Sequence, residues 1–162
     1  MRARAMLRAT VVVGSLLSLG VAGCATGKGM ATKMSTDEAI AARQKLMKEQ
    51  GAAMKAISDA AKAGQVQTIP AHAQKLATTA RQIPALFPAG SVNPATSRAK
   101  PEIWQKWAEF EANAKSLESK ATQLAATAQS GDTAATNTAV AELGKTTCGA
   151  CHTAFRGPEI KK

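Results

Sequence analysis

The chain has 162 residues, a length that suits one domain together with processing segments. Hydrophobic residues make up 45% of it, enough for a core, whereas aromatic residues make up 3% and tyrosine is absent. Because strands favour β-branched and aromatic residues and this chain is rich in alanine, lysine, glutamine and leucine, we expect an all-α protein. The net charge is +10, but no dense basic stripe is interleaved with aromatic residues, so nucleic acid is not an expected partner.

Residues 1–23 have the pattern of an export signal. A basic start with three arginines precedes an apolar stretch, from Thr10 to about residue 22, that is too short to span a bilayer. The stretch ends in Val-Ala-Gly-Cys at Cys24, which resembles the lipobox of bacterial lipoproteins. That resemblance implies cleavage before Cys24 and lipid attachment to it. The alternative is an ordinary cleaved signal followed by an incidental cysteine.

A lipidated Cys24 would tether the protein to a bacterial membrane on its periplasmic side, with residues 24–34 as a tether rich in Gly, Thr, Lys and Ala. Alanine rather than aspartate follows Cys24, which slightly favours the outer membrane. The leader holds three of the 21 basic residues and no acidic one, so the processed chain carries +7. A basic surface of this kind would suit an acidic partner protein.

Two helices are predicted in the first half of the remaining chain, which we expect to form one domain over 35–162. Ser35 and Glu38 have the spacing of a capping box, and the helix that they begin should continue to about residue 63, where Gly64 can end it. Its apolar stripe includes Ile40, Met47 and Met54, which repeat every seven residues. A second helix is predicted from about residue 68 to 82, with a proline in its first turn.

The second half predicts a long connection and two more helices. Prolines and a glycine interrupt helical structure over 83–100. A third helix should begin at Pro101 and continue with apolar steps of three and four past Leu124. After a turn at Gly131, Asp132 is the expected N-cap of a fourth helix, which Gly157 and the following proline should end. Four such helices predict an antiparallel four-helix bundle.

The fourth helix carries the motif that predicts chemistry. Cys148, Cys151 and His152 form C-x-x-C-H, the attachment pattern of haem c. On a helix the two cysteines share a face, so each sulfur can form a thioether to one vinyl group of the same porphyrin. His152 can then bind the iron from the same side. Gly144, one turn before Cys148, would let the porphyrin approach the helix. We therefore expect one covalent haem c.

Other functions of the cysteine pair fit the sequence less well. A thioredoxin-like pair follows a strand at the start of a helix, whereas this pair lies near the end of a helical chain. A structural zinc site requires four ligands. If Cys24 is lipidated, the chain has only two other cysteines and two histidines to supply them. A disulfide between Cys148 and Cys151 would close a very small loop. Thiol–disulfide exchange remains the alternative from another class of function. No second constellation of titratable groups indicates an enzyme.

A haem motif at the C-terminal end of a four-helix bundle resembles class II cytochromes c, the cytochrome c′ family, over about residues 36–156. The first of the matching segments, 43–51, is especially similar to the low-spin cytochrome c-556 type. The segments that carry the resemblance are residues 43–51, Leu86-Phe87-Pro88, Glu102-Ile103-Trp104 and residues 148–156.

The resemblance implies how the iron is ligated. Low-spin members place a methionine on the distal side, at the position that Met47 matches, and His/Met ligation suits electron transfer. High-spin members leave that site open and bind NO or CO. Met47 could instead be a core residue of its helical stripe, because Met commonly fills such positions. We expect an electron-transfer protein with His152 and Met47 as axial ligands, and a five-coordinate, gas-binding haem protein is the alternative.

The same resemblance implies roles for two arginines and the kinds of protein that the chain binds. Arg43 lies one turn before Met47 and would contact a haem propionate, unless it belongs to a solvated helix face. Arg156 lies one turn after His152 and resembles the family's basic residue beside the proximal ligand. Phe155 and Trp104 would pack near the haem edge or within the core. The resemblance also implies a redox partner protein and allows pairing as a homodimer.

Overall fold

The computed structural model describes residues 34–160. The predicted leader over 1–23, the lipid attachment at Cys24 and the tether over 24–34 fall outside the described residues, apart from Met34, which is exposed.

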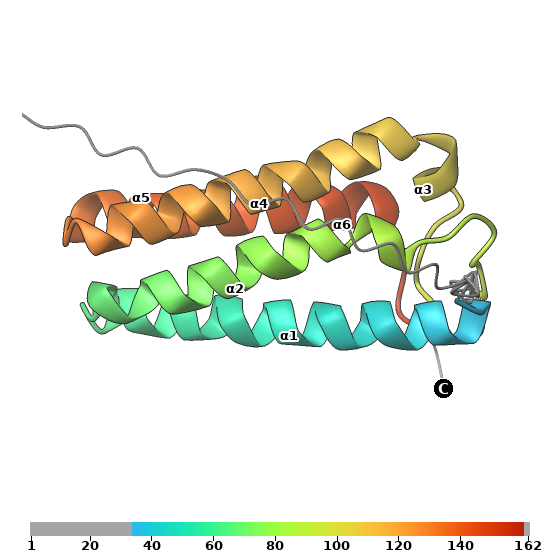
Figure 1. The fold of residues 1–162 in the computed structure, drawn as a ribbon, viewed down its shortest axis with the longest axis horizontal. Coiled ribbons are helices and arrows are strands. Elements are labelled where there is room, and N and C mark those ends of the chain that lie inside the picture. The colour runs from blue at the N-terminus through green and yellow to red at the C-terminus, as the bar shows by residue number, and fades with distance from the viewer. Residues whose placement is uncertain (1–33, 161–162) are drawn as a thin grey trace, which may run out of the picture. The chain divides into compact units, whose positions relative to one another are not determined.

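The described residues form four helical arms that run alternately in opposite directions (Figure 1). Consecutive arms pack side by side, and the fourth returns to pack against the first. Residues 34–160 contain no β-strand, only an isolated antiparallel bridge between Ala99 and Arg156. The predicted all-α, antiparallel four-helix bundle is therefore confirmed. The arms are α1 (Thr36–Lys62), α2 (Ile69–Gln82), α3 (Glu102–Gln105) with α4 (Trp107–Gln129), and α5 (Thr133–Leu143) with the π-helix η3 (Gly144–Gly149) and α6 (Ala150–Phe155).

The helix ends follow the predicted local chemistry. Both bonds of the capping box are present at the start of α1, between Ser35 and Glu38. Gly64, just beyond α1, and Gly131, before α5, have φ of 70° and 77°, a region that only glycine adopts freely. Asp132 caps α5, its carboxylate accepting the backbone N–H of Ala135 at 2.9 Å. The turn at Gly131 and the cap at Asp132 therefore fix where the arm that carries the cysteine motif begins.

Replacing Asp132 with alanine should lower the free energy of unfolding by about 1 kcal/mol, because the N–H of Ala135 loses its acceptor. Asp132→Asn keeps a side-chain oxygen and should retain most of that stability. Urea unfolding followed by circular dichroism compares the two variants. Equal losses in both would show that the cap hydrogen bond is not the source of the stabilisation.

The third predicted helix is broken, which corrects the prediction of one continuous helix from Pro101. Lys106 has φ −117° and ψ 45°, so the single turn α3 and the long α4 meet at an angle. Trp104, within α3, donates its indole N–H to the carbonyl oxygens of Phe87 and Pro88, both at 3.1 Å. These bonds hold α3 against the long connection, and tertiary contact thus overrides helix propensity. Two short 3₁₀ turns, η1 (Val66–Thr68) and η2 (Pro84–Leu86), flank α2.

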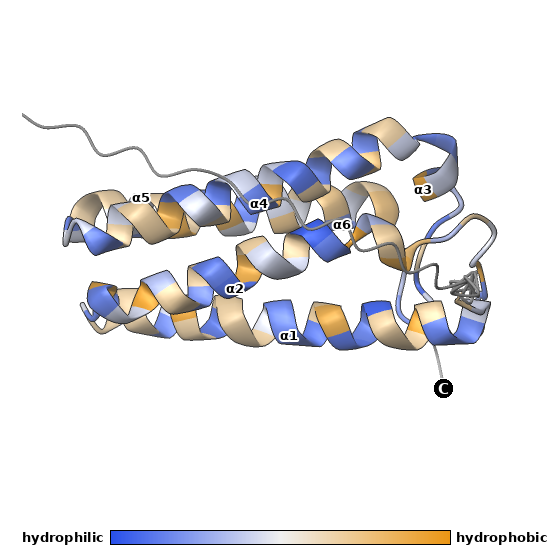
Figure 2. Cartoon of the chain, viewed as in Figure 1, coloured by the Kyte–Doolittle hydropathy of each residue, from blue (hydrophilic) through white to orange (hydrophobic). Residues whose placement is uncertain are grey.

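The core lies between the four arms. Hydrophobic and hydrophilic residues alternate along each arm, as the amphipathic pattern requires (Figure 2). Fully enclosed aliphatic side chains come from every arm, and the large ones include Ile57, Ile69, Leu76, Ile103, Leu124 and Leu143. None of the helices described over residues 34–160 has the length and apolar character needed to cross a bilayer.

Candidate functional site

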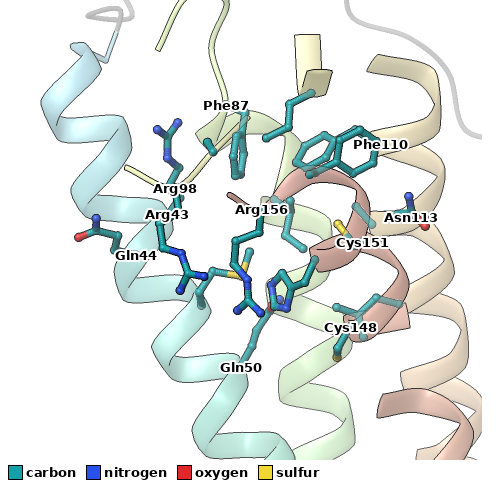
Figure 3. A pocket seen from close by; sticks show the side chains of 18 of the residues that line it. Arg43, Gln44, Gln50, Phe87, Arg98, Phe110, Asn113, Cys148, Cys151 and Arg156 are labelled. Carbon is teal, nitrogen blue, oxygen red and sulfur yellow. The ribbon is translucent and has the colours of Figure 1, made fainter. Parts of the chain in front are cut away.

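A cavity of about 280 Å³ opens between α1, α4, α6 and the connection over 83–100 (Figure 3). Its walls are mainly apolar, and guanidinium, amide and ammonium groups lie among them. Every predicted site residue of the described chain lines it: Arg43, Met47, Cys148, Cys151, His152 and Arg156. The sequence-predicted residues are therefore brought together in one place, although they come from both ends of the domain.

The cysteine motif lies at the junction of η3 and α6. Cys148 is in the π-helical segment, and Cys151 and His152 are in α6. All three side chains are partly buried, and both thiols are free. Thr147 is buried and donates its hydroxyl to the carbonyl oxygen of Leu143. π-Helical turns are uncommon and often occur at functional sites. Here the wider turn includes the first cysteine of the motif, and both Cys148 and Cys151 line the cavity.

Burial shifts the protonation equilibria of the motif. It raises the pKa of the Cys151 thiol to about 11, with a smaller contribution from Cys148. Reactive thiols of exchange proteins have lowered pKa values, so this shift is the opposite of what that chemistry needs. Burial also lowers the pKa of His152, and the charges of Arg156 and Arg98 lower it further. Both effects favour the neutral imidazole, the form in which a histidine ligates a metal.

The two methionines of the α1 stripe have different surroundings. Met47 is half-buried and lines the cavity. Met54 is also half-buried but does not line it, and its methyl carbon lies 3.7 Å from where a Cβ on Gly144 would be. Gly144 therefore faces Met54 between two arms, and it does not line the cavity as its predicted role required. Packing of α5–η3 on α1 accounts for that difference.

Arg43 is 4% exposed, so the solvated-face alternative for this residue is wrong. Its guanidinium donates to the hydroxyl and carbonyl oxygens of Ser91 at 3.1 and 2.9 Å and to the hydroxyl of Ser97 at 2.7 Å. It also stacks over the ring of Phe87, 4.8 Å from the centroid. Arg43 thus holds the long connection on α1 through its two Nη groups.

Aromatic side chains form one wall of the cavity. Phe110 of α4 packs edge-on against Phe87, with ring centroids 4.8 Å apart, and against Phe155 at 5.5 Å. Phe155 was expected near the haem edge and lines the cavity, whereas Trp104 packs behind Phe87 and does not. Phe110 was predicted only as part of the apolar pattern of its helix, and its place in the site is an addition from the structure.

Two polar lining residues were also missed. Arg98 lies in the irregular connection, where no periodicity assigns a direction to a side chain. Asn113 lies on the cavity side of α4, and an amide among apolar neighbours of a helix was the one signal that pointed to it. Arg156 is exposed and lines the cavity at its rim.

The arrangement fits a porphyrin attached through two sulfurs. A flat, apolar group needs apolar walls, and Ile83, Phe110 and Leu117 provide them. Two free thiols and an imidazole lie together on η3 and α6. Guanidinium groups among the lining residues can pair with carboxylates. Fold and site together define a c-type haem protein built on a helical bundle.

Comparison with known proteins identifies the family of c-type haem proteins to which the chain belongs. The chain matches the family model described as cytochrome C′ over residues 38–156, and it belongs to the cytochrome c′ family. Its cofactor is accordingly one covalent haem c.

The relatives cover most of the described domain. A cytochrome c′ of Pararhodospirillum photometricum is 38% identical over 117 residues, which are 70% of this chain and 92% of that protein. A cytochrome c-556 of Agrobacterium tumefaciens (strain B2A) is 36% identical over 117 residues, 70% of this chain and 93% of that protein. Among solved structures, cytochrome c′ of Thermochromatium tepidum has a TM-score of 0.67 at 30% identity, covering 78% of this chain and 99% of that one.

The family membership places the protein among haem proteins of the electron-transfer and gas-binding type. A nitric oxide complex of a variant of cytochrome c prime from Alcaligenes xylosoxidans has a TM-score of 0.68 at 26% identity, covering 77% of this chain and 98% of that one. Proteins of this family are haem-binding carriers. Thiol–disulfide exchange finds no support in these comparisons.

Proposed function

We propose that this protein is a low-spin electron-transfer cytochrome with His152 and Met47 as its axial ligands. The observation that carries the proposal is that Met47, from α1, and His152, from α6, line the same cavity. Met54, one heptad from Met47, lines no part of it, so only one of the two thioethers is offered to the site. A relative named cytochrome c-556 adds support to this assignment.

Each site residue has a role in this proposal. Cys148 and Cys151 hold the haem through thioether bonds, and His152 and Met47 supply nitrogen and sulfur to the metal. When bound, the haem supplies an iron that accepts and releases one electron. Arg43 would pair with a propionate carboxylate, and Arg156, at the rim, would be the basic residue beside the proximal ligand His152. The apolar wall around the buried Phe110 would limit contact of the haem with water, which favours a small reorganisation on electron transfer.

A five-coordinate, gas-binding cytochrome is the second candidate. Solved relatives at 26% identity are nitric oxide and carbon monoxide complexes of cytochrome c prime variants. The cavity beside Met47 would then receive a small gas.

Absorption spectra of the oxidised and reduced protein, before and after addition of CO, separate the two candidates. A low-spin spectrum with a methionine-to-iron charge-transfer band and little response to CO is the expected result. A high-spin native spectrum, with CO bound readily by the reduced protein, would replace the first proposal with the second.

We further propose that the protein acts on the periplasmic side of a bacterial membrane, anchored through a lipid on Cys24. The lipobox-like sequence and the Gly-, Thr- and Lys-rich residues after it support this assignment. Its redox partner would be acidic, to match the +7 charge of the processed chain. We also propose that the protein pairs as a homodimer. One structural relative is described as a cytochrome c′ with a ligand-controlled dimer dissociation.

A further inference from the structure

The long connection between α2 and α3 has an uncharged surface. Residues 83–97 contain no aspartate, glutamate, lysine, arginine or histidine, and no other stretch of this length within residues 34–160 is free of them. Apolar side chains along it are exposed or partly exposed, among them Ala85, Leu86, Ala89, Val92 and Ala95. Such a segment can approach an apolar phase without moving an ion out of water, which would be costly.

The connection is also held in one conformation. The buried guanidinium of Arg43 bonds to Ser91 and Ser97, and the indole N–H of Trp104 bonds to two carbonyl oxygens of the segment. The apolar side chains are therefore presented on an ordered backbone. Little conformational entropy remains to be lost when such a segment rests on another surface.

The connection lies at the end of the bundle where α1 begins (Figure 1). Gln44, near the start of α1, donates its side-chain amide to the carbonyl oxygen of Thr96 at 2.7 Å. The exposed large hydrophobic side chains of residues 34–160 are Met34, just before α1, and Ile160, just after the C-terminal bridge to the connection. Each is 38% exposed, so both add apolar surface near this end of the bundle.

The proposed lipid on Cys24 is joined to the same end, because the chain enters the bundle at Thr36. A tether over 24–34 spans about 40 Å at most, since an extended residue adds up to about 3.6 Å. The 27 residues of α1 alone extend about 40 Å along the bundle, so the opposite end can lie much farther from the anchor. A tethered surface meets the bilayer at a high effective concentration, and a weak contact is then enough to orient the domain.

We propose that the connection over 83–97 rests on the membrane, with the lipid surface as its partner. This inference rests on the lipid anchor proposed above and adds the face that contacts the bilayer. Side chains such as Leu86 and Val92 would enter the interface, and no charged group of the segment would leave water. Phe87, in the same segment, lines the cavity, so this orientation would hold the haem pocket close to the membrane.

Hydrogen exchange followed by mass spectrometry tests the contact. The mature, lipidated holoprotein is reconstituted into vesicles of phosphatidylethanolamine and phosphatidylglycerol. It is compared, in the same vesicles, with the mature holoprotein lacking Cys24, exported through an ordinary cleaved signal sequence. Peptides that cover 83–97 should exchange about threefold or more slowly in the anchored protein, because lipid limits the access of water to their backbone. The turn over 130–132, at the opposite end of the bundle, should exchange equally in both.

Paired substitutions separate lipid contact from local structure. Ala89→Glu with Ala95→Glu places two charges at exposed positions of the connection and removes no packed side chain. This variant should remain with the vesicles in a flotation assay but lose the slowed exchange, because its carboxylates resist transfer out of water. Ala126→Glu with Ala134→Glu is the matched control, since both positions are exposed near the opposite end of the bundle, and it should keep the slowed exchange.

The outcomes distinguish this inference from the proposals on which it rests. Anchored protein whose residues 83–97 exchange as fast as those of the lipid-free chain would overturn the membrane contact and leave the anchor intact. Failure to float with the vesicles would overturn both. Slowed exchange in native membranes but not in pure lipid vesicles would assign the surface to a protein partner instead. The absorption spectrum of the same samples reports the ligation of the haem independently.

Discussion

Replacement of both Cys148 and Cys151 by serine is expected to abolish covalent haem attachment completely. The two thiols are the only cysteine side chains within residues 34–160, and both line the cavity. Serine keeps the shape of each side chain but offers no sulfur, so no thioether can form. Mass spectrometry of the intact protein, expressed in a host that matures c-type cytochromes, should show the apoprotein mass, and acid–acetone should extract any residual haem.

Single variants and a third cysteine sharpen this test. Cys148→Ser and Cys151→Ser should each retain one attachment point, with a lower yield of holoprotein. Cys24→Ser removes the remaining cysteine of the chain, lies outside the motif and should keep the full haem mass. A haem adduct that survives the double variant, or one that disappears with Cys24, would show that the motif is not the attachment site.

The features that were predictable from sequence are those set by neighbours in the chain. Ser35 and Asp132 begin helices through hydrogen bonds that span three residues, so spacing alone identifies them. The seven-residue repeat in α1 correctly placed Ile40 in the core. The C-x-x-C-H spacing is likewise local. For this reason the fold class and the motif followed from short stretches of sequence.

The features that escaped prediction depend on contacts between distant segments. The break at Lys106 follows from the bonds of Trp104 to the connection, which no local pattern reveals. The burial of Arg43 results from Ser91 and Ser97, some fifty residues away, reaching its guanidinium. The side chain of Arg98 is directed by a backbone bridge to the C-terminal end. Tertiary structure alone brings such partners together, so helical periodicity carries no signal for them.

Replacement of Met47 with alanine should convert the spectrum from low-spin to high-spin. The thioether is the single group from α1 that both lines the cavity and binds iron well, and alanine cannot reach the metal. We expect the charge-transfer band to disappear, the reduction potential to fall, and the affinity of the reduced protein for CO to rise about tenfold or more, a change of about 1.4 kcal/mol or more. Absorption spectroscopy, potentiometric titration and CO titration measure the three effects.

Met54→Ala provides the matched control for that experiment. It removes the same side chain from the same helix, one heptad away and equally half-buried, but from a position that faces Gly144. Both variants should lose stability from the missing packing contacts, so a general loosening of α1 would affect them alike. The two variants should differ in their spectra, because only Met47→Ala removes an iron ligand. The spectrum of Met54→Ala should remain low-spin. If both variants kept the native spectrum, Met47 would be a lining residue of the distal pocket and the sixth position would belong to another group or to none.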